Sequence, residues 1–292
     1  MQSQKQHERV FSFEFFPPKN EDAALKLREV RNTLAQLNPR FFSVTFGAGG
    51  STRDRTLETV LEIQKAGSQA APHLSCIASS RTELRELLDA YQQHGIRHIV
   101  ALRGDLPEGD STPGDLPHAR DLVAFIRAET GDHFHIEVAA YPEFHPEARD
   151  SAADLQHFKR KVEAGADSAM TQYFYSPDAY YRFVDSCEKL GITLPIVPGI
   201  MPITNYTQLA RFSDRCGAEI PRWIRRRLEA FGDDAESLRA FGLDVVTDLC
   251  HKLLEAGAPG LHFYTMNLAA PTLAIWNNLD LGAHASSRSV VL

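Results

Sequence analysis

The sequence predicts a (β/α)8 barrel, an α/β fold in which eight parallel strands alternate with helices. Short runs rich in β-branched and aromatic residues alternate with stretches of helical periodicity along all 292 residues. Eight such runs occur, mostly about 25 to 40 residues apart, and a TIM barrel of this kind takes about 250 residues. No linker rich in Pro, Gly or Ser divides the chain, so we expect a single domain over residues 1–292.

The predicted strands are residues 10–16, 41–46, 72–77, 97–102, 134–140, 168–173, 194–198 and 260–264. The predicted helices are residues 23–37, 53–66, 82–94, 119–130, 153–164, 179–190 and 208–216. Two further helical stretches, 221–228 and 235–256, precede the last strand and indicate an elaborated seventh βα unit. Helix N-caps are expected at Asn20, Ser80 and Asp150, and helix-ending glycines at Gly95, Gly165, Gly191 and Gly257.

Two features of the chain stay open at this level. A doubly wound sheet is the alternative fold, because local patterns do not show that the last strand pairs with the first. We expect residues 1–9 to be disordered, since they are polar and precede the first strand, and residues 281–292 to be flexible.

Composition narrows the class of protein. Asp and Glu (38) outnumber Lys and Arg (31), and the net charge of −7 disfavours nucleic acid as a partner. No apolar run reaches the roughly 18 to 20 residues that span a bilayer, and the polar start is not a secretory signal. The four cysteines form no C-x-x-C pair, as is typical of reduced proteins. We therefore expect a cytoplasmic protein without a membrane partner.

The first predicted strand carries a carboxylate. Phe13 and Phe15 alternate with Glu14, and because the aromatic face suits the helix layer, we expect Glu14 to point into the barrel. A carboxyl group at the barrel mouth, flanked by phenyl rings, has a physical reason for a raised pKa and hence for acting as a general acid. A glutamate in a structural ion pair is the alternative interpretation.

The fourth predicted strand ends in Arg103, Gly104 and Asp105. Strand alternation places Arg103 and Asp105 on the same side as Ala101, at the end of the barrel where such folds build their active sites. The glycine between the two charges leaves room for a ligand against the backbone. We interpret the pair as part of a binding site, with a structural ion pair as the alternative.

The predicted helix 153–164 carries a polar stripe. Asp154, His157 and Lys161 are three or four residues apart, with Arg160 adjacent. Such a stripe is usually a solvated face, but beneath the turn at residues 141–147 it is a candidate site for the diphosphate of a dinucleotide. The sixth predicted strand leads to Gln172, whose amide can read the edge of a heterocycle.

Other motifs are weaker. Residues 46–52 (FGAGGST) indicate either a tight βα loop or a phosphate cradle, although Thr52 stands where G-x-G-x-x-G has its last glycine. His133 and His135 have the H-x-H spacing of some metal-dependent barrel hydrolases, with Glu137 on the same parity. No other His/Asp set completes such a site, so no metal is expected.

Six segments taken together resemble one family. They are residues 13–19 (FEFFPPK), 43–50 (SVTFGAGG), 71–76 (APHLSC), 96–105 (IRHIVALRGD), 140–143 (AYPE) and 262–267 (HFYTMN). Their order and spacing resemble bacterial, single-domain methylenetetrahydrofolate reductases from about residue 10 to 280. The resemblance implies an FAD-dependent barrel that reduces 5,10-methylenetetrahydrofolate to 5-methyltetrahydrofolate with NADH or NADPH, by a ping-pong mechanism that serves methionine synthesis.

The resemblance also implies roles for particular residues. Glu14 and Asp105 are the expected catalytic residues: Glu14 supplies the proton that opens the methylene bridge, and Asp105 holds the pterin and tunes the flavin. The expected FAD contacts are Thr45, Phe46, Ala48, His73, Arg103, Gly104, Asp105, His118, Ala119, Tyr141, His145, Ala148, Asp154, His157, Arg160 and Lys161. The expected substrate contacts are Glu14, Asp105, Gln172, Gln208, Phe212 and Tyr264.

The chain departs from the family pattern at several positions. His118 and His157 replace a tyrosine and an asparagine, and both can still form hydrogen bonds. Leu268 replaces an arginine suited to a folate carboxylate, and Arg222, Arg225, Arg226 or Arg227 is the candidate replacement. The alternative functions are another flavin-dependent barrel oxidoreductase, such as one that acts on proline, and a non-catalytic flavin- or pterin-binding barrel. The choice between NADH and NADPH, and whether the chain forms a homo-oligomer, stay open.

Overall fold

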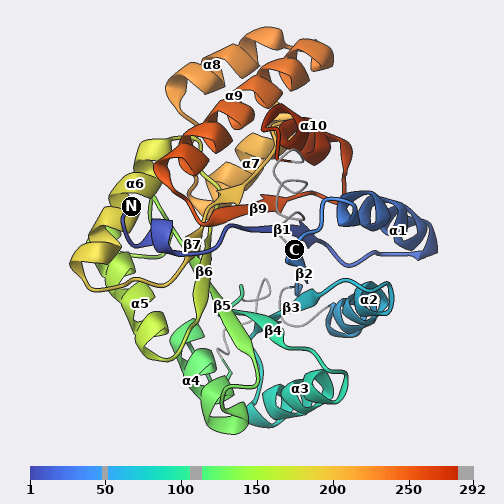
Figure 1. The fold of residues 1–292 in the computed structure, drawn as a ribbon, viewed down its shortest axis with the longest axis vertical. Helices are drawn as coiled ribbons and strands as arrows, with labels where there is room; N and C mark the ends of the chain where they lie inside the picture. The colour runs from blue at the N-terminus through green and yellow to red at the C-terminus, as the bar shows by residue number, and fades with distance from the viewer. Residues whose placement is uncertain (48–51, 106–113, 282–292) are drawn as a thin grey trace, which may run out of the picture.

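The computed structural model describes residues 1–47, 52–105 and 114–281, whose parallel strands are surrounded by helices (Figure 1). The strands are β1 (Val10–Phe15), β2 (Phe41–Val44), β3 (Ala70–Ser75), β4 (His98–Leu102), β5 (His135–Ala140), β6 (Ser168–Thr171), β7 (Ile196–Val197), β8 (Gly199–Ile200) and β9 (Gly260–Tyr264). Their order in the sheet is β7-β6-β5-β4-β3-β2-β1-β9-β8.

The pairing of the first and last strands decides the fold. β1 pairs in parallel with β2 on one side and with β9 on the other, which confirms the barrel and rules out the doubly wound alternative. The predicted strand 194–198 is instead two short strands on either side of Pro198, with β7 pairing with β6 and β8 with β9. Proline has no N–H to donate to a neighbouring strand, so it interrupts the strand where the ring is completed.

The helices begin and end close to their predicted positions. They are α1 (Glu21–Ala35), α2 (Arg53–Lys65), α3 (Arg81–Gln93), α4 (Ala119–Thr130), α5 (Ser151–Glu163), α6 (Pro177–Lys189), α7 (Tyr206–Cys216), α8 (Arg222–Phe231), α9 (Ala235–Ala256) and α10 (Ala270–Asn278). Between β8 and β9 the chain forms α7, α8 and α9, which confirms the elaborated seventh unit. Helix α10 was not predicted. No helix in the described part of the chain is long and apolar enough to cross a membrane.

Local hydrogen bonds explain several helix ends. The side chains of Asn20, Ser80 and Asp150 accept hydrogen bonds from backbone N–H groups three residues later, as predicted for N-caps. Glu83 also accepts the N–H of Ser80, which completes a capping box. The four predicted helix-ending glycines all have positive φ.

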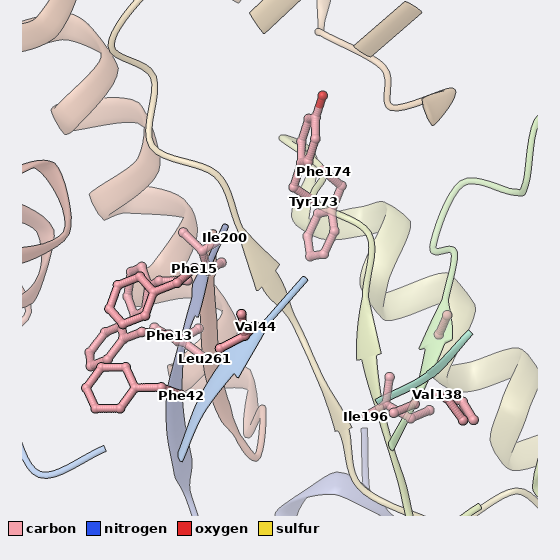
Figure 2. Packing of buried hydrophobic residues seen from close by; sticks show 14 of the residues in the cluster. Phe13, Phe15, Phe42, Val44, Val138, Tyr173, Phe174, Ile196, Ile200 and Leu261 are labelled. Carbon is pink, nitrogen blue, oxygen red and sulfur yellow. The ribbon is translucent and has the colours of Figure 1, made fainter. Parts of the chain in front are cut away.

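Strand β1 separates the core from the barrel interior. Phe13 and Phe15 are fully buried and gather with Phe42 on one side of β1 and β2 (Figure 2). The ring of Phe42 lies 5.1 Å from that of Phe15, and Trp276 of α10 packs against Phe13. The aromatic face of β1 therefore contacts the helix layer, as predicted, and Glu14 points into the barrel.

The first residues of the chain are ordered, which corrects the prediction of disorder for residues 1–9. A short 3-10 helix covers Gln4–Gln6, and the side chain of Gln4 is fully buried. Gln4 Oε1 accepts the N–H of Ile196 in β7, and Ser3 donates two hydrogen bonds to Glu188 of α6. These buried polar contacts hold a segment whose polar composition alone indicates no structure. The predicted flexible tail, residues 281–292, falls outside the described residues from residue 282 onward.

Candidate active site

A cavity of about 390 Å³ opens beside the carboxyl ends of β4 and β5. This is the end of a (β/α)8 barrel where the loops carry chemistry, and the volume lies in the range of about 300–1,000 Å³ typical of ligand sites. The lining residues are Ala101, Leu102, Arg103, Gly104, Asp105, His118, Ala119, Arg120, Ala139, Tyr141, His145, Glu147, Ala148, Asp154, His157 and Lys161. Eleven of the predicted cofactor contacts are among them.

Gly104 is one of the residues that line this cavity. Its φ is +85°, a conformation that favours glycine, and a Cβ at this position would lie 1.8 Å from Oγ of Ser75. Ser75 donates a hydrogen bond of 2.7 Å to the carbonyl of Arg103, which fixes the turn. The N–H of Ile77 donates to the carbonyl of Arg103, so the pairing with β3 continues to Arg103, and the positive φ of Gly104 ends the strand alternation only after it. Arg103 and Asp105 both line the cavity, at the end of the barrel where they were predicted.

Arg103 is held by a residue that the sequence analysis did not select. Its guanidinium forms a two-point ion pair with Glu147, with N–O distances of 2.5 and 2.7 Å. The hydrogen bond with Glu147 is the largest cause that raises the pKa of Arg103. Arg120 also lines the cavity from the first turn of α4 and was likewise missed. A charged residue directly after a predicted helix start was the available signal for Arg120.

The polar stripe of α5 faces the cavity in part. Asp154, His157 and Lys161 line it, as predicted, whereas Arg160 is exposed and does not. The Lys161 ammonium donates a hydrogen bond of 2.6 Å to the carbonyl of Ala139 in β5. Burial lowers the pKa of Lys161 to about 8, and Asp154 opposes this shift. Lys161 is therefore the deeply placed cation of this wall.

The turn after β5 supplies an aromatic ring and an imidazole. The rings of Tyr141 and His145 meet edge to face at 4.7 Å, and the N–H of His145 donates to Asp154. Burial raises the pKa of Tyr141, and the charges of Asp154 and Asp105 add to this effect. Burial lowers the pKa of His145, which favours its neutral form. The side chains of Tyr141 and His145 are thus largely uncharged at neutral pH.

Glu14 lies inside the barrel mouth between two imidazoles. Its Oε2 is 3.4 Å from Nε2 of His73 in β3 and 3.7 Å from Nε2 of His262 in β9. The predicted environment of phenyl rings is wrong, because Phe13 and Phe15 point to the opposite face of the strand. Ser12 and Nδ1 of His262 are 2.7 Å apart, which directs Nε2 of His262 towards Glu14.

The predicted substrate positions lie on three elements around the mouth. Tyr264, at the end of β9, donates to the carbonyl of Thr171 in β6, one residue before Gln172. Burial raises the pKa of Tyr264, and the nearby charge of Glu14 adds to the effect. Gln208 and Phe212 are one turn apart on α7. Tyr264 is therefore close to Glu14 and bound to the residue next to Gln172, whereas no such contact joins Gln208 or Phe212 to Tyr264.

Of the other five predicted cofactor contacts, four lie in the described part of the chain and do not line the cavity. Thr45 and Phe46 follow β2, and the side chain of Thr52 accepts the N–H of Gly47. His73 lies beneath the mouth against Glu14. Ala48 and the rest of the glycine-rich turn, residues 48–51, fall outside the described residues. Arg160, the fourth position, is exposed on α5.

The candidate metal-binding histidines are engaged in protein contacts. Nε2 of His133 bonds the carbonyl of Ile96, and Nε2 of His135 bonds Oγ of Ser168. Across residues 1–47, 52–105 and 114–281, no group of three or more His, Cys, Asp or Glu side chains is arranged to hold a metal ion.

Comparison with known proteins places the chain in a family. The family model described as "Methylenetetrahydrofolate reductase" matches residues 1–280. The chain belongs to the methylenetetrahydrofolate reductase family. The 5,10-methylenetetrahydrofolate reductase of Salmonella typhimurium is 44% identical over 271 residues, which cover 92% of this chain and 90% of that protein. This chain is thus an enzyme of the methylenetetrahydrofolate reductase family, and it matches most of the length of the bacterial protein.

More distant relatives extend this picture. The probable methylenetetrahydrofolate reductase (NADH) of Oryza sativa is 41% identical over 286 residues, which cover 93% of this chain but 48% of the plant protein. A solved structure of a Clostridium thermocellum protein, described as binding two copies of 5-methyl-5,6,7,8-tetrahydrofolic acid, superposes with a TM-score of 0.67. The superposition covers 98% of each chain at 16% sequence identity, so it supports the fold alone.

Proposed function

We propose that this protein reduces 5,10-methylenetetrahydrofolate to 5-methyltetrahydrofolate with electrons that NADH or NADPH delivers through bound FAD. The observation that carries the proposal is the meeting of eleven motif positions in one cavity at the catalytic end of the barrel. A bound flavin supplies the hydride transfer. NAD(P)H and the folate would bind in turn, in a ping-pong sequence.

The cavity suits a dinucleotide cofactor. The first turn of α4 lines it with Ala119 and Arg120, and backbone N–H groups at a helix N-terminus favour phosphate. Lys161 of α5, which is half-buried, adds a positive charge to the lining. Gly104 lines the cavity with its backbone alone, and a side chain at this position would collide with Ser75. These groups would hold the diphosphate and the flavin ring against the ends of β4 and β5.

Glu14 would act as the general acid in the folate half of the reaction. Opening the methylene bridge requires a proton on the folate, and Glu14 is a carboxyl group at the barrel mouth that can supply it. His73 and His262 contact the same carboxylate oxygen and keep the side chain oriented. Asp105, on the cavity rim, would hold the pterin together with Gln172, and Tyr264 would close the substrate side.

A spectrum of the purified protein tests the proposed function. We expect a yellow protein whose flavin absorbance is bleached by NADH or NADPH under anaerobic conditions and restored by 5,10-methylenetetrahydrofolate. A colourless protein that gains no flavin when given FAD would contradict the proposal. Bleaching without recovery by the folate would indicate a flavin-dependent barrel with a different substrate, and adding proline in place of the folate checks that alternative.

A further inference from the structure

A second carboxylate, Glu137 of β5, lies buried in the barrel interior and has no part in the function proposed above. Its Oε2 lies 2.9 Å from Nε2 of His98, the first residue of β4. Burial is the largest influence and opposes ionisation of Glu137, but the hydrogen bond from His98 and the charges of His98, His262 and His135 together outweigh it, and the pKa of Glu137 is lowered. A buried charge is costly unless it is paired. An ion pair at this depth therefore calls for an explanation beyond the proposed active site.

The pair lies between Glu14 and the amino-terminal end of the barrel. His98 and His135 begin β4 and β5, the ends opposite to the cavity. The side chain of His135 is 47% exposed, and its ring meets that of His98 edge to face at 4.6 Å. On the other side, Nε2 of His262 is 3.7 Å from Oε2 of Glu14, and the charge of His262 contributes to the lowered pKa of Glu137.

Titratable groups face both carboxylates from several strands. Five groups interact electrostatically with Glu137: His98 of β4, His135 of β5, His73 of β3, and His262 and Tyr264 of β9. Those facing Glu14 are His73, His262 and Tyr264. Within the described part of the chain, Nε2 of His73 and Nε2 of His262 are buried and make no hydrogen bond. Both nitrogens are therefore able to exchange a proton with Glu14 after a small movement of its carboxyl group.

We propose that Glu137 and His98 return protons to Glu14 from the amino-terminal end of the barrel, through His135 at the surface and His262 beneath the carboxylate. The inference rests on the proposed role of Glu14. In each turnover Glu14 gives one proton to a folate nitrogen and is left as a carboxylate, and one proton from water at His135 restores it. Glu137 and His98 touch neither substrate nor cofactor, so they are positioning residues that act through Glu14.

Access explains why a second route is useful. The side chain of Glu14 is only 11% exposed, and ligands bound at the mouth would cover it further. Solvent at the opposite end stays in contact with His135 while the mouth is occupied. A route along the barrel axis therefore lets Glu14 regain its proton without waiting for the mouth to open.

The test compares one turnover with many in Glu137→Gln, which keeps the size and one hydrogen bond to His98 but removes the proton carrier. The enzyme is reduced anaerobically with NADH and mixed with 5,10-methylenetetrahydrofolate, and flavin absorbance is followed. Before mixing, Glu14 has time to receive a proton by any route, so we expect the rate of the first turnover to stay within about twofold of that of the unsubstituted enzyme. The steady-state rate should fall by about tenfold or more, with a larger solvent isotope effect.

Controls separate this role from a structural one. Glu188→Gln changes a glutamate that binds Ser3 outside the barrel, and it should alter neither rate. His98→Gln removes the other partner and carries the test if Glu137→Gln does not fold. Equal slowing of the first turnover and of the steady state would indicate a structural role and overturn the inference, as would unchanged rates in both variants. If Glu14→Gln still reduced the folate, the proposed role of Glu14 itself would be wrong.

Discussion

Glu147 holds Arg103 in a two-point ion pair on the wall of the cavity, with N–O distances of 2.5 and 2.7 Å. Arg103 is also one of the cations expected to contact FAD. Glu147 therefore competes with an anionic cofactor for the same guanidinium, because a carboxylate and a phosphate both bind it through two parallel hydrogen bonds.

The first prediction follows from this competition. In Glu147→Gln, Arg103 is released, and we expect FAD to bind about two- to fivefold more tightly, since a partly exposed ion pair contributes about 0.2–1 kcal/mol. Titration of the apoprotein with FAD measures the change. Glu163→Gln is the matched control, because both glutamates are 60% exposed but Glu163 pairs with Lys159 away from the cavity. Weaker FAD binding in Glu147→Gln would show that Glu147 orients Arg103 for the cofactor instead.

The second prediction concerns the acid. Glu14→Gln should leave flavin reduction by NADH nearly intact and reduce the rate of folate reduction by about 100-fold or more, because only the folate half needs a proton donor. Stopped-flow absorbance measures each half-reaction separately, so the first serves as the control for the second. Equal loss of both rates would place Glu14 elsewhere in the mechanism.

The third prediction is a pH dependence of FAD binding. The pKa of Lys161 is lowered to about 8 by burial, so its ammonium is charged at pH 7 and loses its charge as the pH rises through 8. An anionic cofactor should therefore bind more weakly above pH 8, by up to about tenfold per pH unit. FAD titrations between pH 6.5 and 9.5 measure this slope. The slope should vanish in Lys161→Met and persist in Lys159→Met, and an unchanged slope in Lys161→Met would assign the titration to another group.

The fourth prediction concerns the turn at Gly104. Gly104→Ala adds a Cβ that would lie 1.8 Å from Oγ of Ser75, in a backbone conformation with φ of +85°. Gly67→Ala has a similar φ of +87° with no atom within 4 Å, so it isolates the backbone strain of about 1–2 kcal/mol. We expect Gly104→Ala to lower the free energy of unfolding by more than Gly67→Ala and to weaken FAD binding, whereas Gly67→Ala leaves FAD binding unchanged. Denaturant unfolding and FAD titration measure the two effects, and equal losses in both variants would exclude the collision with Ser75.

Local sequence patterns predicted most of the elements. Alternation in β1 directed Glu14 inward and Phe13 outward, because successive side chains of a strand point to opposite faces. The three- and four-residue spacing in α5 placed Asp154 and Lys161 on one face, because that spacing matches a helical turn. The same patterns do not extend past Gly104, whose positive φ ends the alternation, and they failed at the first nine residues, whose order depends on contacts with α6 and β7.

By itself, the sequence determined the strands, the helices with their caps, and which side chains face the barrel, since these depend on neighbours within a few positions. Only the tertiary structure decided which side chains meet. His73 and His262 come from β3 and β9, and their approach to Glu14 depends on the pairing of β1 with β9 and on the stagger of the strands around the closed ring. The pairing of Arg103 with Glu147 likewise depends on how the loop after β4 and the loop after β5 are placed beside each other, which no local pattern encodes.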